Sequence, residues 1–176
     1  ENRLRYNVVG IDYATDSYIS KARGNEITFN NVGIMVRATA APYETVISEN
    51  IIDNNNGVGI AIYSGSSGLV IENNTIEGNR NFDTDVGCGI LVKGANLSRL
   101  KINGNWFETN GDHETTAVDI FMLGAGSESS TGAALRTAIV AILPVAERAN
   151  FTSGGCSIGT VSIAENAFVF TKYNIV

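Results

Sequence analysis

Apolar residues recur in short bursts that alternate with polar residues, and each burst is followed by Asn, Gly or Asp. Four segments share one order: an apolar residue, two variable positions, an Asn, one further position and a second apolar residue. They are Thr45–Asn56, Leu69–Asn79, Leu100–Asn110 and Val161–Phe170, with a fainter copy at Asn25–Ile27. Period-two alternation predicts β-strands, and Asn, Gly and Asp predict the turns between them.

The spacing of these segments predicts a repeat architecture. The Asn residues at equivalent positions are Asn25, Asn50, Asn74, Asn105 and Asn166. Short strands joined by turns at about 25 residues per repeat are typical of a coil of parallel strands, a β-helix. We expect the repeated Asn side chains to stack and to hydrogen-bond to one another along the coil.

A second set of short apolar segments predicts another strand in each turn of the coil. These segments are Ile34–Val36, Ile60–Ile62, Ile90–Val92 and Val118–Ile120, with Ile11–Tyr13 as an earlier member. Gly33, Gly59 and Gly89 precede three of them. The predicted fold is therefore all-β, a parallel β-helix of about six turns.

The chain, residues 1–176, is predicted to be one β-helix segment of a longer protein, because it begins inside the repeat pattern. The interval 124–157 departs from the pattern and is expected to be either an excursion from the coil or an extra irregular turn. Its apolar run Ala138–Val145 needs burial, and we expect a neighbouring subunit to supply it.

Composition narrows the choice of partners. Twelve basic and 18 acidic residues give a net charge of −6, which argues against nucleic acid or an anionic membrane as a partner. No apolar run approaches the length needed to cross a bilayer, so membrane insertion is not expected. Cys88 and Cys156 are expected to be buried free thiols.

Acidic residues gather in the segments that follow each Asn pattern. Stacked turns would place these segments at one corner of the coil, with Asp53, Glu77, Asp83, Asp85, Glu108, Asp112 and Glu114. Carboxylates one turn apart lie about 5 Å apart, as in retaining glycosidases, and two turns apart they suit inverting ones. The same residues would also fit a Ca²⁺ site or an ordinary solvated edge.

Particular residues are candidates for chemistry on a polysaccharide. Asp119 lies between Val118 and Ile120, so alternation predicts that it points outward from a rigid strand. We expect Asp119, Glu108 and Asp112 to act as acid and base, without a metal or other cofactor. Trp106, whose neighbour Phe107 should be core, is predicted to stack on sugar. The other predicted substrate-binding residues are His113, Asp83, Asp85 and Arg80. A lyase would instead use Lys93, Arg99 or Arg80 to neutralise a uronate.

The segments VISENII, VIENNTI and KINGNWF, with the strands GVGIAI and GCGILV, resemble the right-handed parallel β-helix of the pectin-lyase-like superfamily. The resemblance covers Gly33–Leu123 and resumes at Val161–Phe170. Within that superfamily the chain is most similar to bacteriophage tailspikes and tail fibres. This resemblance implies a homotrimer in a virion or outside the cell that binds, and often cleaves, bacterial surface polysaccharide. No pectate lyase or polygalacturonase motif is found, so the resemblance assigns no catalytic residue.

Other readings stay open at this point. One is a structural or adhesive β-helix of a viral fibre, without chemistry. Another is a secreted bacterial polysaccharide lyase or epimerase.

Overall fold

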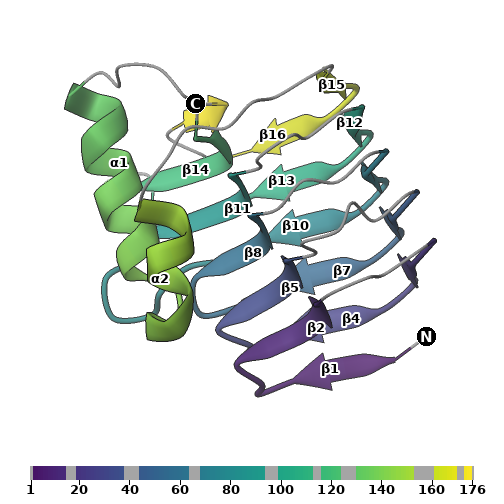
Figure 1. The fold of residues 1–176 in the computed structure, drawn as a ribbon, viewed down its shortest axis with the longest axis horizontal. Helices are drawn as coiled ribbons and strands as arrows, with labels where there is room; N and C mark the ends of the chain where they lie inside the picture. Colours follow the sequence, from purple (N-terminus) through teal and green to yellow (C-terminus); the bar gives the residue numbers. More distant parts are fainter. Residues whose placement is uncertain are drawn as a thin grey trace.

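The chain forms three parallel β-sheets that wind around a common interior, as Figure 1 shows. The structure is a computed structural model and describes residues 2–14, 19–37, 44–63, 68–93, 99–112, 116–123, 130–152, 161–169 and 173–175. All strand pairs are parallel, with neighbouring strands taken from successive turns. The predicted all-β parallel β-helix is confirmed, with three strands per turn.

Sheet A comprises β1 (Arg3–Arg5), β4 (Glu26–Thr28), β7 (Ile51–Asp53), β10 (Thr75–Glu77), β13 (Trp106–Glu108) and β16 (Ala167–Val169). Sheet B comprises β2 (Val9–Tyr13), β5 (Val32–Val36), β8 (Val58–Ile62), β11 (Gly87–Val92), β14 (Ala117–Met122) and β17 (Tyr173–Ile175). Sheet C comprises β3 (Lys21–Arg23), β6 (Val46–Ser48), β9 (Val70–Glu72), β12 (Leu100–Asn103) and β15 (Val161–Ala164). Four turns, from β2 to β13, follow one another without interruption; β14, β15 and β16 form a further turn that two helices interrupt.

Each sheet contributes a column of apolar side chains to the interior of the coil. In sheet A the column is Ile27, Ile52, Ile76 and Phe107, all fully buried and aligned in register. Phe107 stacks on Phe168 of the next turn, with ring centroids 5.2 Å apart. Burial of these large side chains supplies the main driving force for winding the strands together.

The predicted Asn ladder lies at the corner between sheets C and A. The Nδ2 of Asn25 donates to the Oδ1 of Asn50 at 3.0 Å, and the same contact joins each later pair up to Asn166. The backbone N–H of each lower Asn also donates to the Oδ1 above it. This ladder confirms the stacking predicted from the repeat and satisfies polar groups that are shielded from water.

A second Asn ladder, which the sequence reasoning missed, lies at the corner between sheets A and B. It runs through Asn7, Asn30, Asn55, Asn79 and Asn110, again from Nδ2 to Oδ1. Each member from Asn30 onward lies five residues after a member of the first ladder. The residue before each ladder Asn has a positive φ, as at Glu49 (56°) and Asn54 (50°), which turns the chain sharply at the corner.

Near the start of β2, β5, β8 and β11 in sheet B, one position has room only for glycine. A Cβ built on Gly33 would lie 2.5 Å from the carbonyl oxygen of Gly59 and 2.8 Å from Ile52. Gly10, Gly33, Gly59 and Gly89 form one column in this position. Because Ile120 pairs with Ile90, Asp119 occupies the same position in the fifth turn. The predicted alignment of Val118–Ile120 with Ile90–Val92 is therefore wrong by two residues.

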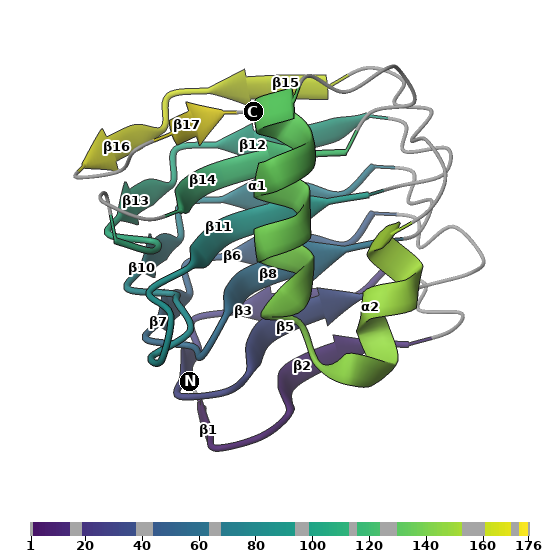
Figure 2. The same ribbon diagram turned by 90° about the vertical axis from the view of Figure 1, so that its left-hand side faces the viewer.

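Two helices cover the outer face of sheet B, as Figure 2 shows for α1 (Ser130–Ala141) and α2 (Val145–Thr152). Ile139, Leu143 and Phe151 are buried there in one cluster with Met35, Leu91 and other outward residues of the sheet. Pro144 has no backbone N–H to continue α1 and lies directly before α2, where its fixed φ suits a helix start. Ile139, Val140 and Leu143 of the apolar run Ala138–Val145 are thus buried on their own chain, so burying these side chains does not need the neighbouring subunit that we expected, whereas Val145 stays exposed.

Polar contacts fasten α2 to the ends of sheet B strands. Arg37, which follows β5, pairs with Asp12 at 2.7 Å and with Glu147 of α2 at 2.5 Å. The Lys93 ammonium, which follows β11, donates to the carbonyl of Asn150. Lys93, proposed above as a uronate-neutralising cation, therefore has a structural contact with the helix.

Candidate functional site

The outer face of sheet A presents two aligned columns of side chains. The carboxylate column is Asp53, Glu77 and Glu108, the last residues of β7, β10 and β13, which pair directly with one another. The Trp106 column is Ile51, Thr75 and Trp106, the first residues of the same strands. Both columns point outward because the middle residue of each strand points into the core. Sheet A, whose strands lie side by side in Figure 1, thus carries a stripe of carboxylates next to a stripe formed by Ile51, Thr75 and Trp106.

The stacking of like charges shapes the acid–base behaviour of the carboxylate column. Partial burial, and then the neighbouring carboxylates of Asp53 and Glu108, raise the pKa of Glu77. Burial also raises the pKa of Asp53, although its hydrogen bond from Asn54 at 2.6 Å opposes the rise. Burial and crowding thus favour the protonated form of both Glu77 and Asp53.

Trp106 is the large aromatic residue of this face. Its side chain is 46% exposed, whereas the adjacent Phe107 is fully buried, as predicted. The indole Nε1 donates a 3.0 Å hydrogen bond to Oε2 of Glu108, which fixes the ring against the end of the carboxylate column. Ile51, two strands away in the same column, is 50% exposed. An oriented indole beside carboxylates offers both a stacking surface and hydrogen-bond acceptors.

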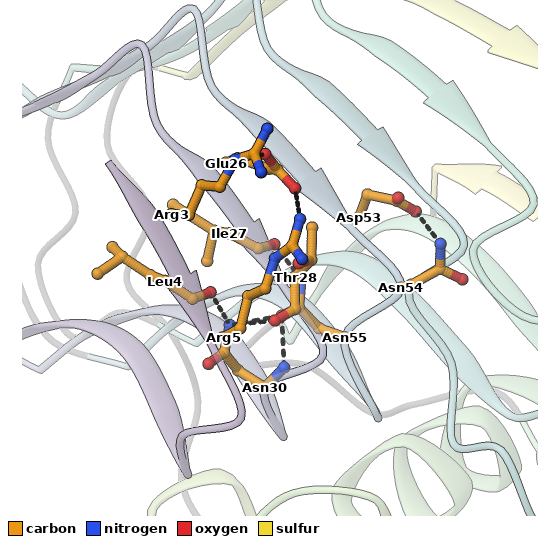
Figure 3. A network of polar contacts seen from close by, with 10 residues as sticks. All are labelled: Arg3, Leu4, Arg5, Glu26, Ile27, Thr28, Asn30, Asp53, Asn54 and Asn55. Atoms are coloured by element: carbon orange, nitrogen blue, oxygen red, sulfur yellow. Dashed lines mark hydrogen bonds and ion pairs between the residues drawn. The ribbon is translucent and has the colours of Figure 1, made fainter. Parts of the chain in front are cut away.

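Basic residues lie at the N-terminal end of this face. Arg3 pairs with Glu26 at 2.8 Å, and Arg5 contacts the same carboxylate, as Figure 3 shows. Hydrogen bonding to Arg5 and the charges of both arginines lower the pKa of Glu26. A hollow of about 400 Å³ lies at this end, lined by Arg23, Gly24, Asn25, Glu26, Glu49 and Ile51. The face therefore runs from a hollow lined by Arg23, Glu26 and Glu49 to the exposed indole.

The bends after β10 and β13 lie against each other, in the arrangement expected of stacked turns. The N–H of Asp112 donates to the carbonyl of Asp85 at 2.8 Å. Arg80 and Asp85 form an ion pair of 3.5 Å within one bend, and Asp83 is exposed at its tip. His113 and Glu114 lie outside the described residues. The bends therefore bring Asp85 and Asp112 together, on loops adjoining the carboxylate column rather than within it.

Asp119 does not belong to this surface. It is fully buried, and its Oδ1 accepts a 3.0 Å hydrogen bond from Nδ2 of Asn110. The predicted outward orientation is wrong because regular alternation breaks at this position: Val118 packs under the helices, whereas Ile120 faces the interior. Asp119 cannot reach a polysaccharide on the outer face of the β-helix, so its predicted catalytic role is withdrawn.

Cys88 lies on the covered side of sheet B and is a free, fully buried cysteine. Burial, followed by the nearby charge of Asp119, raises the pKa of its thiol. A protonated thiol in this position packs as a small apolar group. Cys156 lies outside the described residues.

The part of the chain that the structure describes shows neither a metal-binding cluster nor a membrane-spanning helix. No cluster of three or more His, Cys, Asp or Glu side chains is arranged to hold a metal ion. No helix in the described ranges combines the length and apolar character needed to cross a membrane.

Comparison with known proteins identifies the family. The family model described as "Right handed beta helix region" matches residues 1–135, most of the chain. No curated protein and no solved structure gave a significant match. With parallel sheets, aligned turns and Asn ladders in the matched region, the chain belongs to the right-handed β-helix family.

Proposed function

We propose that the outer face of sheet A binds a bacterial surface polysaccharide. The observation that carries the proposal is the exposed Trp106, held by Glu108 beside the in-register carboxylate column. These groups stand on paired strands, which are rigid mounts for a binding site. The function agrees with the β-helix family but is inferred here from the chemistry of the face.

The geometry suits a glycan chain lying along the axis of the β-helix. Successive strands are about 4.8 Å apart, so each turn offers one further set of contacts to an extended polymer. Sugar rings would pack on Trp106 and Ile51, while their hydroxyl groups donate to Asp53, Glu77 and Glu108. Because the column is acidic, we expect the sugars bound here to be neutral or to carry amino groups.

The test is binding of purified bacterial surface polysaccharides by isothermal titration calorimetry, with Trp106→Ala and a matched control. Phe82 is similarly exposed, at 49%, but lies in the bend between β10 and β11. We expect Trp106→Ala to weaken binding at least about tenfold, the scale of a lost aromatic contact at a binding centre. We expect Phe82→Ala to bind normally. Equal losses of affinity in the two variants would indicate a site that includes the bends rather than sheet A alone. Normal affinity in both variants would refute the proposed site.

Hydrolysis of the bound glycan is a second candidate function, favoured by the register of Glu77 with Glu108. Residues paired across adjacent strands are about 5 Å apart, near the separation of the two carboxyl groups in retaining glycosidases. The raised pKa of Glu77 suits a proton donor, and Glu108 would then be the nucleophile. Glu77→Gln and Glu108→Gln should each abolish release of reducing ends. Products absorbing in the ultraviolet would indicate a lyase instead.

We further propose that the chain is a segment of a tailspike-like homotrimer, located in a phage tail or outside the cell. The support is the sequence resemblance described above. Light scattering of the purified protein tests the trimer. If polysaccharide neither binds nor is cleaved, the alternative of a purely structural fibre segment is favoured.

A further inference from the structure

A second hollow, built from different residues, lies where the α1–α2 junction meets the turns that lead into sheet B. Its volume is about 380 Å³. Asn31, Asn56 and Asn81 line one side, and Val8, Pro144 and Arg148 are among the residues that complete it. We call this hollow the amide groove. None of its lining residues belongs to the outer face of sheet A.

The amide side chains of the groove are held in place by the structure behind them. Asn31 and Asn56 directly follow Asn30 and Asn55, which are fully buried in the second Asn ladder. The Oδ1 of Asn56 accepts hydrogen bonds from the N–H of Phe82 at 3.1 Å and from Nδ2 of Asn81 at 3.4 Å. Asn31 is exposed, and Asn56 and Asn81 are partly exposed. The groove therefore presents positioned amide groups that a ligand can reach.

The groove has a positive character in an acidic protein. Arg148 is the one charged residue among those that line it. Its Nε donates to the carbonyl of Leu143 at 3.0 Å, which anchors the guanidinium and keeps its two terminal nitrogens for other contacts. The adjacent carboxylate of Glu147 is paired with Arg37. The first turn of α2, at Val145, adds the positive end of a helix dipole.

A neighbouring hollow enlarges this positive region. It has a volume of about 380 Å³, shares Ala141 and Arg148 with the amide groove, and adds Arg136. Exposed apolar side chains also border the groove, with Val8 60% and Val145 76% exposed. Amides, an anchored guanidinium and apolar surface are together the groups that recognise a sugar ring bearing a carboxylate.

We propose that the amide groove is a binding site for an acidic sugar residue, such as a uronic acid within a polysaccharide. The carboxylate pairs with the terminal nitrogens of Arg148, and the ring hydroxyls exchange hydrogen bonds with Asn31 and Asn56. A single guanidinium matches the one negative charge and planar shape of a carboxylate. This site goes beyond the proposed function, because the acidic face of sheet A disfavours such a residue.

The experiment compares two probes on the intact chain by calorimetry at low salt. One probe is a tetrasaccharide containing glucuronic acid, and the other is the same tetrasaccharide with its carboxyl groups reduced to alcohols. We expect the acidic probe to bind at least about tenfold more tightly, in line with loss of a charge-assisted contact. Arg148→Gln should remove this preference, whereas Lys101→Gln, an equal charge change on an exposed residue of sheet C, should keep it.

A second variant protects the test against misfolding of Arg148→Gln. Asn31→Trp places a bulky ring in the groove from an exposed position and leaves Arg148 unchanged, and we expect it to abolish binding of the acidic probe with an unchanged circular dichroism spectrum. Equal binding of the two probes, or normal binding by both groove variants, would overturn the proposal. Trp106→Ala separates the two sites, because it should weaken binding at sheet A and leave the acidic preference intact.

Discussion

The side-chain amide of Asn110 donates a 3.0 Å hydrogen bond to the carboxylate of Asp119, nine residues later in the chain. In the turns below, the same amide hydrogen goes to the next Asn, as from Asn79 to Asn110 at 2.9 Å. Asp119 thus takes the place of the acceptor at the upper end of the second ladder. A residue that seemed to be a candidate acid is an internal part of the β-helix.

The first prediction concerns this contact. Asp119→Ala should lower the free energy of unfolding by about 1–3 kcal/mol, because the buried Nδ2 of Asn110 loses its acceptor. Asp119→Asn keeps an oxygen in the same place and should cost less. Urea unfolding measures both values. A folded Asp119→Asn variant that loses polysaccharide binding would contradict the assignment of Asp119 to the interior.

The second prediction addresses the ladders themselves. Asn79 accepts from both the backbone N–H and the Nδ2 of Asn55, and it donates to the carbonyl of Ile52 and to Asn110. Asn79→Ala leaves several of these buried groups without partners and should cost about 3 kcal/mol or more. The control Asn31→Ala, at an exposed position, should change stability little. Similar costs for the two variants would show that the ladder contributes little.

The third prediction is a pH dependence from Glu77, whose folded-state pKa is raised by burial and by its acidic neighbours. Between the unfolded pKa, about 4.3, and the higher folded pKa, the folded chain binds more protons than the unfolded chain. Stability contributed by protonated Glu77 is therefore lost as pH rises through that window. Glu77→Gln removes the titrating group and should be more stable than wild type at pH 7.

The measurement is the difference in unfolding free energy between Glu77→Gln and wild type at pH 4 and at pH 7. We expect a gain below about 1 kcal/mol at pH 7, because the site is partly solvated, and a smaller gain at pH 4. Asp83→Asn, in an exposed bend, serves as the control. A difference independent of pH would contradict the crowding of the carboxylate column.

The fourth prediction concerns the attachment of α2. Arg37→Met removes both ion pairs of Arg37 and leaves the nearly buried Glu147 unpaired, so α2 should exchange its amide hydrogens faster. We expect a loss of about 1–3 kcal/mol, partly restored by adding Glu147→Gln. The control is Arg23→Met, which breaks an exposed pair with Glu49 and should leave α2 unchanged. Equal rates of amide hydrogen exchange in α2 of both variants would contradict the role of Arg37 in attaching this helix.

The repeat pattern was sufficient to predict the architecture, because stacking of turns forces equivalent residues into columns. The first Asn ladder, the inward Phe107 and the outward Trp106 all followed from spacing and alternation. The second ladder was also visible in the sequence as an Asn five residues after each first-ladder Asn from Asn25 to Asn105. It was missed because these Asn residues were interpreted only as turn formers.

The errors came from features that alternation does not encode. Asp119 stands in the glycine column above Gly89, where the chain departs from period two, and alignment of the strands from Ile90 and Ile120 would have revealed this. The burial of Ile139 and Leu143 on sheet B depends on where 130–152 folds back, which the repeat does not specify. The stacking of Asp53, Glu77 and Glu108 was predicted from the repeat, but their place on the strand ends rather than in the bends required the register of β7, β10 and β13.

Trp106 is the single tryptophan of the chain, so its fluorescence reports directly on the outer face of sheet A. Titration with a bacterial surface polysaccharide that the protein binds should shift the emission to shorter wavelength, because a stacked sugar ring removes water from the indole. The change should saturate at the concentration found by calorimetry. Calorimetric binding with an unchanged tryptophan spectrum would contradict the proposed site.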